Sequence, residues 1–353
     1  MKLNQMFCKL MLTMASMLYL ASGVFAKDLV IMTSLPSMEF PFFVHMQKQL
    51  DEEAKRIGGI KLIAADGQNK VPKQTADVES AIIQGVDGIL ISPIDVNAMA
   101  PALQQAIDNG IPVVTVDRYV GGVPGIYAHV GADNVKGGEA QARLIMERFP
   151  NGATIVNLQG QPGASPAIDR NRGLHNILDG NSKYKIVAEQ TANWSRDQGM
   201  TVTENILTGL SSAPDVINAA NDDMALGAME AVKARGIDVK ILGFDALPEA
   251  IAAVRDGSLM ATVEQFPGGQ SKTALNLLVN ASSTSRGRTG VLLMGVLLLM
   301  ISLVGVGQIE VWHDDLETLP DDNSIKSAVL EVDRELGGVA NIQIVINADA
   351  LDR

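Results

Sequence analysis

The amino-acid sequence predicts an α/β protein made of two doubly wound lobes, each built on a parallel sheet. Between residue 27 and about residue 279, short runs rich in Val, Ile and Leu alternate with longer segments whose apolar residues recur at a spacing near 3.6. The runs are apolar along their whole length, which is typical of parallel strands covered by helices on both faces. Nine runs could form one large sheet, but the segment is long enough for two sheets of ordinary size, and we favour two lobes.

The predicted elements alternate regularly along the chain. The predicted strands are residues 29–32, 61–64, 88–91, 112–116, 154–158, 185–188, 216–219, 240–244 and 261–263. The clearest predicted helices are residues 43–57, 97–109, 136–149, 222–234 and 247–256. Right-handed crossovers between such strands bring their carboxyl ends to one edge of each sheet, and ligands of doubly wound folds bind at that edge.

Composition restricts the classes of function. The chain has 353 residues, of which 47% are hydrophobic and 19% charged, so two or more domains are expected. The formal net charge of −12 argues against a nucleic-acid partner, because phosphate binding requires clustered Lys and Arg. Cys8 is the single cysteine, and the four histidines have no metal-ligand spacing, so we expect no disulfide, no metal and no cofactor. The sequence has no phosphate-binding glycine loop and no Ser nucleophile motif, so we expect a protein that is not an enzyme.

Residues 1–26 have the pattern of a signal peptide. Lys2 and Lys9 give a positive start, residues 10–20 are apolar, and Val24-Phe25-Ala26 forms a cleavage site of small-residue type. We expect the mature chain to begin at Lys27 and to be exported to the periplasm. The alternative is a buried N-terminal helix of the fold.

The residues that follow the predicted strands share one chemistry. They are planar polar side chains and aromatic rings, which can pair with neighbouring hydroxyl groups and cover the C–H faces of a sugar ring. The candidate ligand-binding residues are Phe42, Phe43, Asp117, Arg118, Arg170, Trp194, Asn221, Asp245 and Gln265. These groups suit a monosaccharide or a similar polyol.

Each candidate also has an alternative structural role. Asp245 could cap the helix that follows it, and so could Asp222, which stands next to Asn221. Either Phe42 or Phe43 could belong to the core, as could Trp194. Asp117 and Arg118 could form a surface ion pair, and Arg170 could be a solvated helix residue.

Several motifs, in order, resemble the ribose-type family of periplasmic sugar-binding proteins, the periplasmic binding protein type 1 fold that also includes the ligand domains of the lactose-repressor family. The motifs are Pro41-Phe42-Phe43, Val116-Asp117-Arg118, Ala132-Asp133-Asn134 with Gly137-Gly138, the run from Asn221 to Ala228, and Gly243-Phe244-Asp245. The resemblance covers residues 27–279. It implies that the polar candidates hydrogen-bond a sugar and that Phe42, Phe43 and Trp194 sandwich it. One departure is Phe40, since the ribose binder has Asn there, and this leaves the identity of the sugar open.

The same resemblance implies an architecture and a partner. One lobe would comprise residues 27–132 with a return segment at 266–279, and the other residues 133–265. The chain would cross between the lobes three times. Ligand binding would favour hinge closure, and an ABC permease in the inner membrane would recognise the closed form.

The C-terminal region does not fit this family. Residues 280–288 read as a junction, and residues 289–306 form an uncharged apolar run long enough for a transmembrane helix that would tether the protein to the inner membrane. Residues 307–353 resemble a partial α+β fragment of a resistance-nodulation-division superfamily exporter, through Leu319-Pro320-Asp321-Asp322 and Leu336-Gly337-Gly338. Arg286 and Arg288 precede the apolar run and favour a cytoplasmic side, whereas export of the N-terminal part requires the opposite.

Three functional hypotheses follow. The first is a solute-binding receptor of a sugar ABC import system. The second is a membrane-tethered transport component, or a truncated receptor fused to an exporter fragment with no working uptake role. The third, the effector domain of a transcription regulator, is poorly supported because a signal peptide stands where DNA-binding helices would be.

Overall fold

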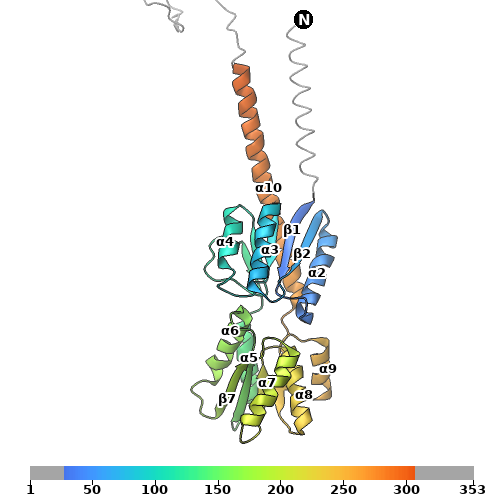
Figure 1. Ribbon diagram of the computed structural model, residues 1–353, viewed down its shortest axis with the longest axis vertical. Helices are drawn as coiled ribbons and strands as arrows, with labels where there is room; N and C mark the ends of the chain where they lie inside the picture. Colours follow the sequence, from blue (N-terminus) through green and yellow to red (C-terminus); the bar gives the residue numbers. More distant parts are fainter. Residues whose placement is uncertain (1–27, 307–353) are drawn as a thin grey trace, which may run out of the picture. The chain divides into compact units, whose positions relative to one another are not determined.

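The computed structural model describes residues 28–306. The chain divides into two compact units, Met1–Gly290 and Val291–Arg353, and the first contains both sheets. Each sheet is parallel throughout, as the uninterrupted apolar runs predict (Figure 1). The two-lobed α/β prediction is therefore confirmed.

The N-lobe is built on a five-stranded sheet of order β2-β1-β3-β4-β5. Its strands are β1 (Leu29–Leu35), β2 (Ile60–Asp66), β3 (Gly88–Ile91), β4 (Val113–Val116) and β5 (Ala128–Val130), and its helices are α2 (Pro41–Ile57), α3 (Val71–Gln84) and α4 (Ala100–Asp108). Buried residues of α2 pack on one face of the sheet, and those of α3 and α4 on the other (Figure 1). The sheet therefore has a hydrophobic core on each side.

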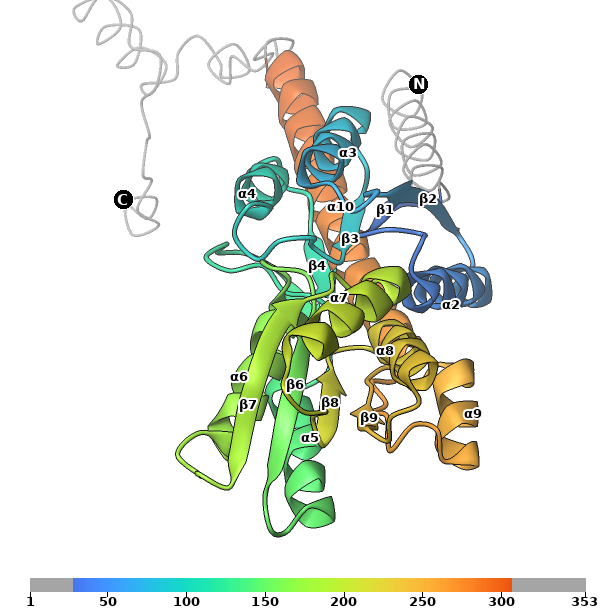
Figure 2. The ribbon, with the colours of Figure 1, turned by 60° about the horizontal axis from the view of Figure 1, so that its bottom comes forward.

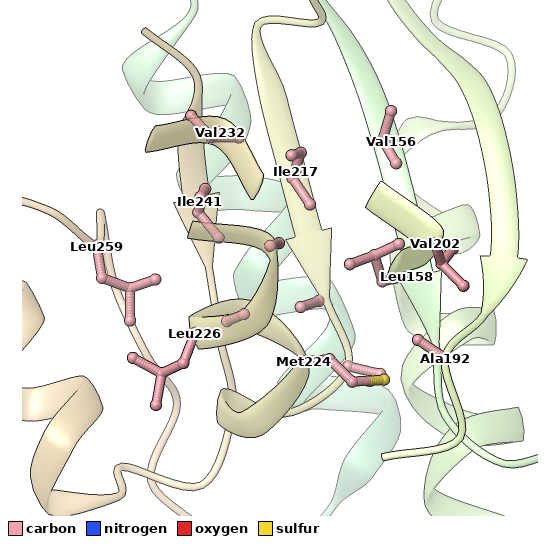
Figure 3. Packing of buried hydrophobic residues seen from close by; sticks show 14 of the residues in the cluster. Val156, Leu158, Ala192, Val202, Ile217, Met224, Leu226, Val232, Ile241 and Leu259 are labelled. Carbon is pink, nitrogen blue, oxygen red and sulfur yellow. The ribbon is translucent and has the colours of Figure 1, made fainter. Parts of the chain in front are cut away.

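The C-lobe is built on a four-stranded sheet of order β7-β6-β8-β9 (Figure 2). Its strands are β6 (Ala153–Gln159), β7 (Tyr184–Thr191), β8 (Val216–Ala219) and β9 (Lys240–Leu242). Its helices are α5 (Asn134–Arg148), α6 (Ser165–Leu178), α7 (Arg196–Gly209), α8 (Asp222–Arg235) and α9 (Pro248–Asp256). Apolar side chains of β6, β8 and β9 meet those of α7 and α8 in one cluster (Figure 3). The opposite face packs against α5 and α6.

One predicted strand is not formed, and one observed strand was not predicted. Residues 261–263 do not form a strand, because only Ala261 bridges to Leu242 before the chain leaves the C-lobe. The three-residue β5 escapes sequence analysis because it is short and has His129 at its centre. Within residues 28–306 the chain crosses between the lobes twice, between β5 and α5 and again before α10, and not three times.

The long helix α10 (Pro267–Val306) returns the chain to the N-lobe. Ala274, Leu275 and Leu278 join the cluster that contains α2 and β1. The helix continues through residues 280–288 without a break, so the expected junction is helical. Its first part fits closely against the sheet: a Cβ atom on Gly88 would lie 2.6 Å from the Ser282 hydroxyl oxygen.

The transmembrane prediction for residues 289–306 is not supported. Among the residues that the structure describes, none of the helices is long and apolar enough to cross a membrane. The predicted signal peptide and the exporter-like segment at 307–353 lie outside the described residues.

Candidate functional site

One pocket gathers all nine candidate residues. Its lining consists of Phe40, Phe42, Phe43, Asp117, Arg118, Pro166, Arg170, Trp194, Asn221, Asp245 and Gln265. The first five belong to the N-lobe and the next five to the C-lobe, while Gln265 lies where the chain crosses between them. The open space is about 30 Å³, room for about two water molecules. A sugar ring therefore requires the lining to move apart before it can enter.

Aromatic rings form much of the wall. Phe42 and Phe43 open α2 and meet edge to face, with ring centroids 5.2 Å apart. Phe40 precedes the helix and lies 6.5 Å from Phe43, centroid to centroid. On the C-lobe side, Trp194 is 5% exposed and has the guanidinium groups of Arg118 and Arg170 within 6 Å of its ring. These faces suit the C–H surfaces of a ring-shaped polyol.

The backbone around the pocket adopts unusual conformations. Asp117, Trp194 and Asp245 have φ angles of 61°, 66° and 119°, in the region that side chains other than glycine rarely occupy. Such conformations persist only where the surrounding structure enforces them, and they cluster at functional sites. Here they direct the chain sharply after β4, β7 and β9.

Four buried charges alternate in sign across the site. Arg118 Nε lies 3.8 Å from Asp117 Oδ2, and Arg170 Nη1 lies 3.6 Å from Asp245 Oδ1. Both separations exceed an ordinary hydrogen bond, so neither pair uses its donors and acceptors fully on the other. The pocket therefore offers both hydrogen-bond donors and acceptors to a ligand.

Burial dominates the protonation equilibria of these groups. It raises the pKa of Asp117, against the opposing pull of Arg118 and Arg170, and it raises the pKa of Asp245 well above the usual range. It lowers the pKa of Arg118 to about 10 and also lowers that of Arg170. Arg118 therefore stays charged at neutral pH, because a pKa of about 10 is still well above 7.

Three buried polar atoms of the pocket residues find no hydrogen-bond partner among residues 28–306. They are the donors Arg118 Nε and Trp194 Nε1 and the acceptor Gln265 Oε1. An unpaired buried polar atom costs about 1–3 kcal/mol. A ligand hydroxyl can donate and accept at once, so a polyol is suited to satisfy such a mixed set.

The structure decides several of the alternative roles. Asn221, and not Asp222, caps α8 by accepting from the backbone N–H of Met224 at 2.9 Å. Asp222 instead accepts from Thr262 Oγ1 and the Leu247 N–H, and it does not line the pocket. Asp245 caps no helix, since α9 begins after Leu247 without a side-chain cap.

The remaining alternatives prove partly correct. Phe42, Phe43 and Trp194 line the pocket and also belong to the hydrophobic clusters. Arg118 and Arg170 are 3% and 4% exposed, so neither is a surface residue. Burial and pocket lining are thus compatible roles for the same side chain.

Two lining residues and two supporting ones were not predicted from the sequence. Phe40 was noted only as a departure from the family pattern, although it packs against the clusters of both lobes. Pro166 begins α6 and has no polar group that could draw attention to it. Asn134 and Phe244 lie in motifs that carry the family resemblance, but only the structure reveals their contacts with Arg170.

Elsewhere in the described residues, a larger groove of about 290 Å³ lies between β2 and α3. It contains none of the candidate residues. Within the same part of the chain, no group of His, Cys, Asp and Glu side chains could hold a metal ion.

Two parallel-sheet lobes with a polar and aromatic pocket between them define a solute-binding protein of the periplasmic type. The periplasmic binding protein domain matches residues 31–285. The ribose import binding protein RbsB of Bacillus subtilis is 43% identical over 68% of this chain and 77% of its own length.

Solved structures agree with this assignment. The Caulobacter myo-inositol binding protein, bound to myo-inositol, is 44% identical with a TM-score of 0.69, over 70% of this chain and 85% of that one. A solute-binding protein from Bacillus halodurans with bound myo-inositol is 32% identical with a TM-score of 0.70, over 73% and 90%. The chain belongs to the ribose-type family of periplasmic sugar-binding proteins, which are the substrate-binding proteins of ABC importers and not enzymes.

Proposed function

We propose that this protein binds a monosaccharide or a related cyclic polyol between its lobes and delivers it to an ABC permease in the inner membrane. The observation that carries the proposal is the set of unpartnered buried atoms, Arg118 Nε, Trp194 Nε1 and Gln265 Oε1, around one aromatic-walled pocket. Export by the N-terminal signal peptide would place the protein where its permease can reach it.

The ligand supplies hydrogen-bond partners for the buried polar groups of the pocket. Its hydroxyl groups accept from Arg118 and Arg170 and donate to Asp117 and Asp245, while its C–H faces cover the rings of Phe42, Phe43 and Trp194. Because both lobes contribute contacts, the ligand stabilises the arrangement in which the lobes are together.

The polyol class is favoured because the pocket mixes unpaired donors with an unpaired acceptor, and a hydroxyl group can satisfy both kinds. The names of the relatives also favour a polyol ligand, since they include binders of ribose and of myo-inositol. Phe40 removes a polar contact from the pocket edge, which favours a ligand with an apolar edge at that point.

The test uses the two tryptophans of the chain. In a Trp312→Phe variant, the fluorescence of Trp194 alone reports on the pocket during titration with myo-inositol, D-ribose, L-arabinose and xylitol. A saturable change with one of them, lost in Asp117→Ala and Asp245→Ala, supports the proposal. Absence of any saturable response in a protein that circular dichroism shows to be folded contradicts it.

A further inference from the structure

Arg170 is held in place by groups that are not part of the pocket lining. Asn134 Oδ1 accepts from Arg170 Nε at 2.9 Å, and the Ala220 carbonyl accepts from Nη1 at 2.6 Å. The Phe244 ring lies against the guanidinium, with the ring centroid 3.6 Å from Cζ. These contacts fix both the plane and the rotation of the guanidinium.

The orientation of the Asn134 amide is dictated by its neighbours. Its oxygen faces Arg170 Nε, which can only donate, and its nitrogen donates to the Ala132 carbonyl at 3.3 Å, which can only accept. A flipped amide would place its N–H₂ group against the N–H of Arg170 Nε and its oxygen against the Ala132 carbonyl oxygen. The side chain is 6% exposed, so water does not readily replace either bond.

The position of Asn134 depends on close packing of α5 against α6. A Cβ atom on Gly138 would lie 2.1 Å from the Arg170 carbonyl oxygen, and one on Gly173 would lie 2.1 Å from the Val135 carbonyl oxygen. Two glycines therefore allow the helices to touch at the turn that carries Arg170. At this close approach the short side chain of Asn134 reaches the guanidinium.

On these contacts, and resting on the sugar-binding function proposed above, we propose that Asn134 is a positioning residue for Arg170. It lies outside the pocket and acts on the ligand only through the guanidinium. By engaging Nε it turns the remaining N–H groups of Arg170 toward the pocket and Asp245 before a sugar arrives. Such preorganisation lowers the ordering cost of binding.

The experiment measures the dissociation constants of the full-length protein for myo-inositol and D-ribose by calorimetry, together with its melting temperature. Asn134→Leu keeps the size and removes the acceptor, and we expect it to weaken binding about tenfold. Asn134→Asp keeps an acceptor for Nε but loses the donor to the Ala132 carbonyl, so it should restore part of the affinity that Asn134→Leu loses. Should Asn134→Leu fail to fold, Asn134→Ala makes the same test with less bulk.

The matched control is Asp133→Ala. Asp133 caps α5 by accepting from the Lys136 N–H, so its loss loosens the same helix end without touching Arg170. We expect this control to lower the melting temperature and leave affinity unchanged. Equal loss of affinity in Asp133→Ala and Asn134→Leu, or wild-type affinity in Asn134→Leu, overturns the proposal.

A second measurement separates positioning from a general structural role. In an Arg170→Lys background, Asn134→Leu should cause no further loss of affinity, because its effect passes through the guanidinium. Additive losses in the double variant contradict this. If the wild-type protein binds neither probe nor any other sugar, the proposed function itself fails, and that outcome is distinct from a failure confined to Asn134.

Discussion

The guanidinium carbon of Arg170 lies 3.6 Å from the centroid of the Phe244 ring, so a buried cation is stacked on a buried aromatic face. Phe244 is 1% exposed and follows β9, whereas Arg170 lies on α6. The contact links the pocket to the core of the C-lobe. It also depends on a glycine, since a Cβ atom on Gly137 would lie 2.5 Å from Phe244 Cζ.

A Gly137→Ala substitution should therefore displace the Phe244 ring and, with it, Arg170. Alanine favours the helical state over glycine by about 1 kcal/mol, so a loss of stability would report the steric clash and not helix propensity. We expect the free energy of unfolding to fall by about 1–3 kcal/mol and sugar affinity to weaken. Urea unfolding and calorimetry measure the two effects.

The matched control is Gly209→Ala in α7, where an added methyl group meets no atom within 4 Å. It should leave affinity unchanged and stability equal or higher. A Gly137→Ala protein as stable as this control would show that the ring moves aside freely.

The uninterrupted apolar runs made the fold predictable. Residues 88–91 and 216–219 were predicted as strands with the bounds that β3 and β8 have, because buried parallel strands carry Val, Ile and Leu on both faces. The strand ends also indicated which polar residues would gather, since parallel topology brings them to one edge.

The supporting contacts of Arg170 were not predictable in this way. They depend on how closely α5 approaches α6, which is set by Gly138 and Gly173 meeting backbone atoms of the opposite helix. A sequence shows that glycines are present, but not which two helices they bring together. The continuation of α10 through residues 280–288 escaped for a similar reason, because the Ser-rich stretch looks like a linker until Ser282 is seen against the sheet.

Asp222 should give the folded protein a pH-dependent stability. It is fully buried, and burial raises its pKa from 3.8 to about 6. The folded state thus binds this proton more tightly than the unfolded chain. Protonation of Asp222 therefore adds up to about 3 kcal/mol to the free energy of unfolding. This contribution is fully present below about pH 4 and is lost as the pH rises through about 6.

Urea unfolding between pH 4 and pH 8, for the wild type and Asp222→Asn, measures this effect. The variant keeps only one of the two oxygens that accept from Thr262 Oγ1 and the Leu247 N–H, which shifts its stability at every pH. The comparison therefore uses how steeply the free energy of unfolding changes with pH, and not its absolute value. The wild-type curve should fall relative to the variant across pH 4–7. Parallel curves would rule out Asp222 as the source.

Arg286 should stabilise the docking of α10 on the N-lobe. Its Nε and Nη2 each donate to Asp87 at 2.6 Å, and Nη2 also donates to the Asp28 carbonyl. Asp87 in turn accepts from the Val30 N–H, which ties the pair to β1. We expect Arg286→Met to lower the free energy of unfolding by about 1 kcal/mol, because the contact is bidentate and partly shielded from water.

Arg143→Met provides the comparison in urea unfolding. Arg143 pairs with Glu139 one turn away on the exposed side of α5, and its side chain is 59% exposed. Such pairs contribute about 0.3–0.5 kcal/mol. An Arg286→Met loss no larger than that of Arg143→Met would mean that the apolar face of α10 docks without help from the ion pair.

Tyr119 should contribute to sugar affinity without touching the sugar. It lies in the N-lobe, outside the pocket lining, and its hydroxyl donates to Asp169 of the C-lobe at 3.3 Å. Its backbone N–H donates to Ser165 Oγ at 3.0 Å, and nearby the Val96 N–H donates to the Gly163 carbonyl at 2.8 Å. These bonds join the lobes directly, so they stabilise the arrangement that a ligand also stabilises.

Removing one such bond should therefore weaken binding, because ligand energy must then supply more of the cost of holding the lobes together. We expect Tyr119→Phe and Ser165→Ala each to raise the dissociation constant about threefold to tenfold, in line with a net hydrogen bond of about 0.5–1.5 kcal/mol. The control is Tyr127→Phe, since Tyr127 is 53% exposed on the N-lobe.

Small-angle scattering of the unliganded proteins should show a larger radius of gyration for Tyr119→Phe than for Tyr127→Phe. Equal affinity and equal size for the two variants would mean that the pocket contacts alone hold the lobes together.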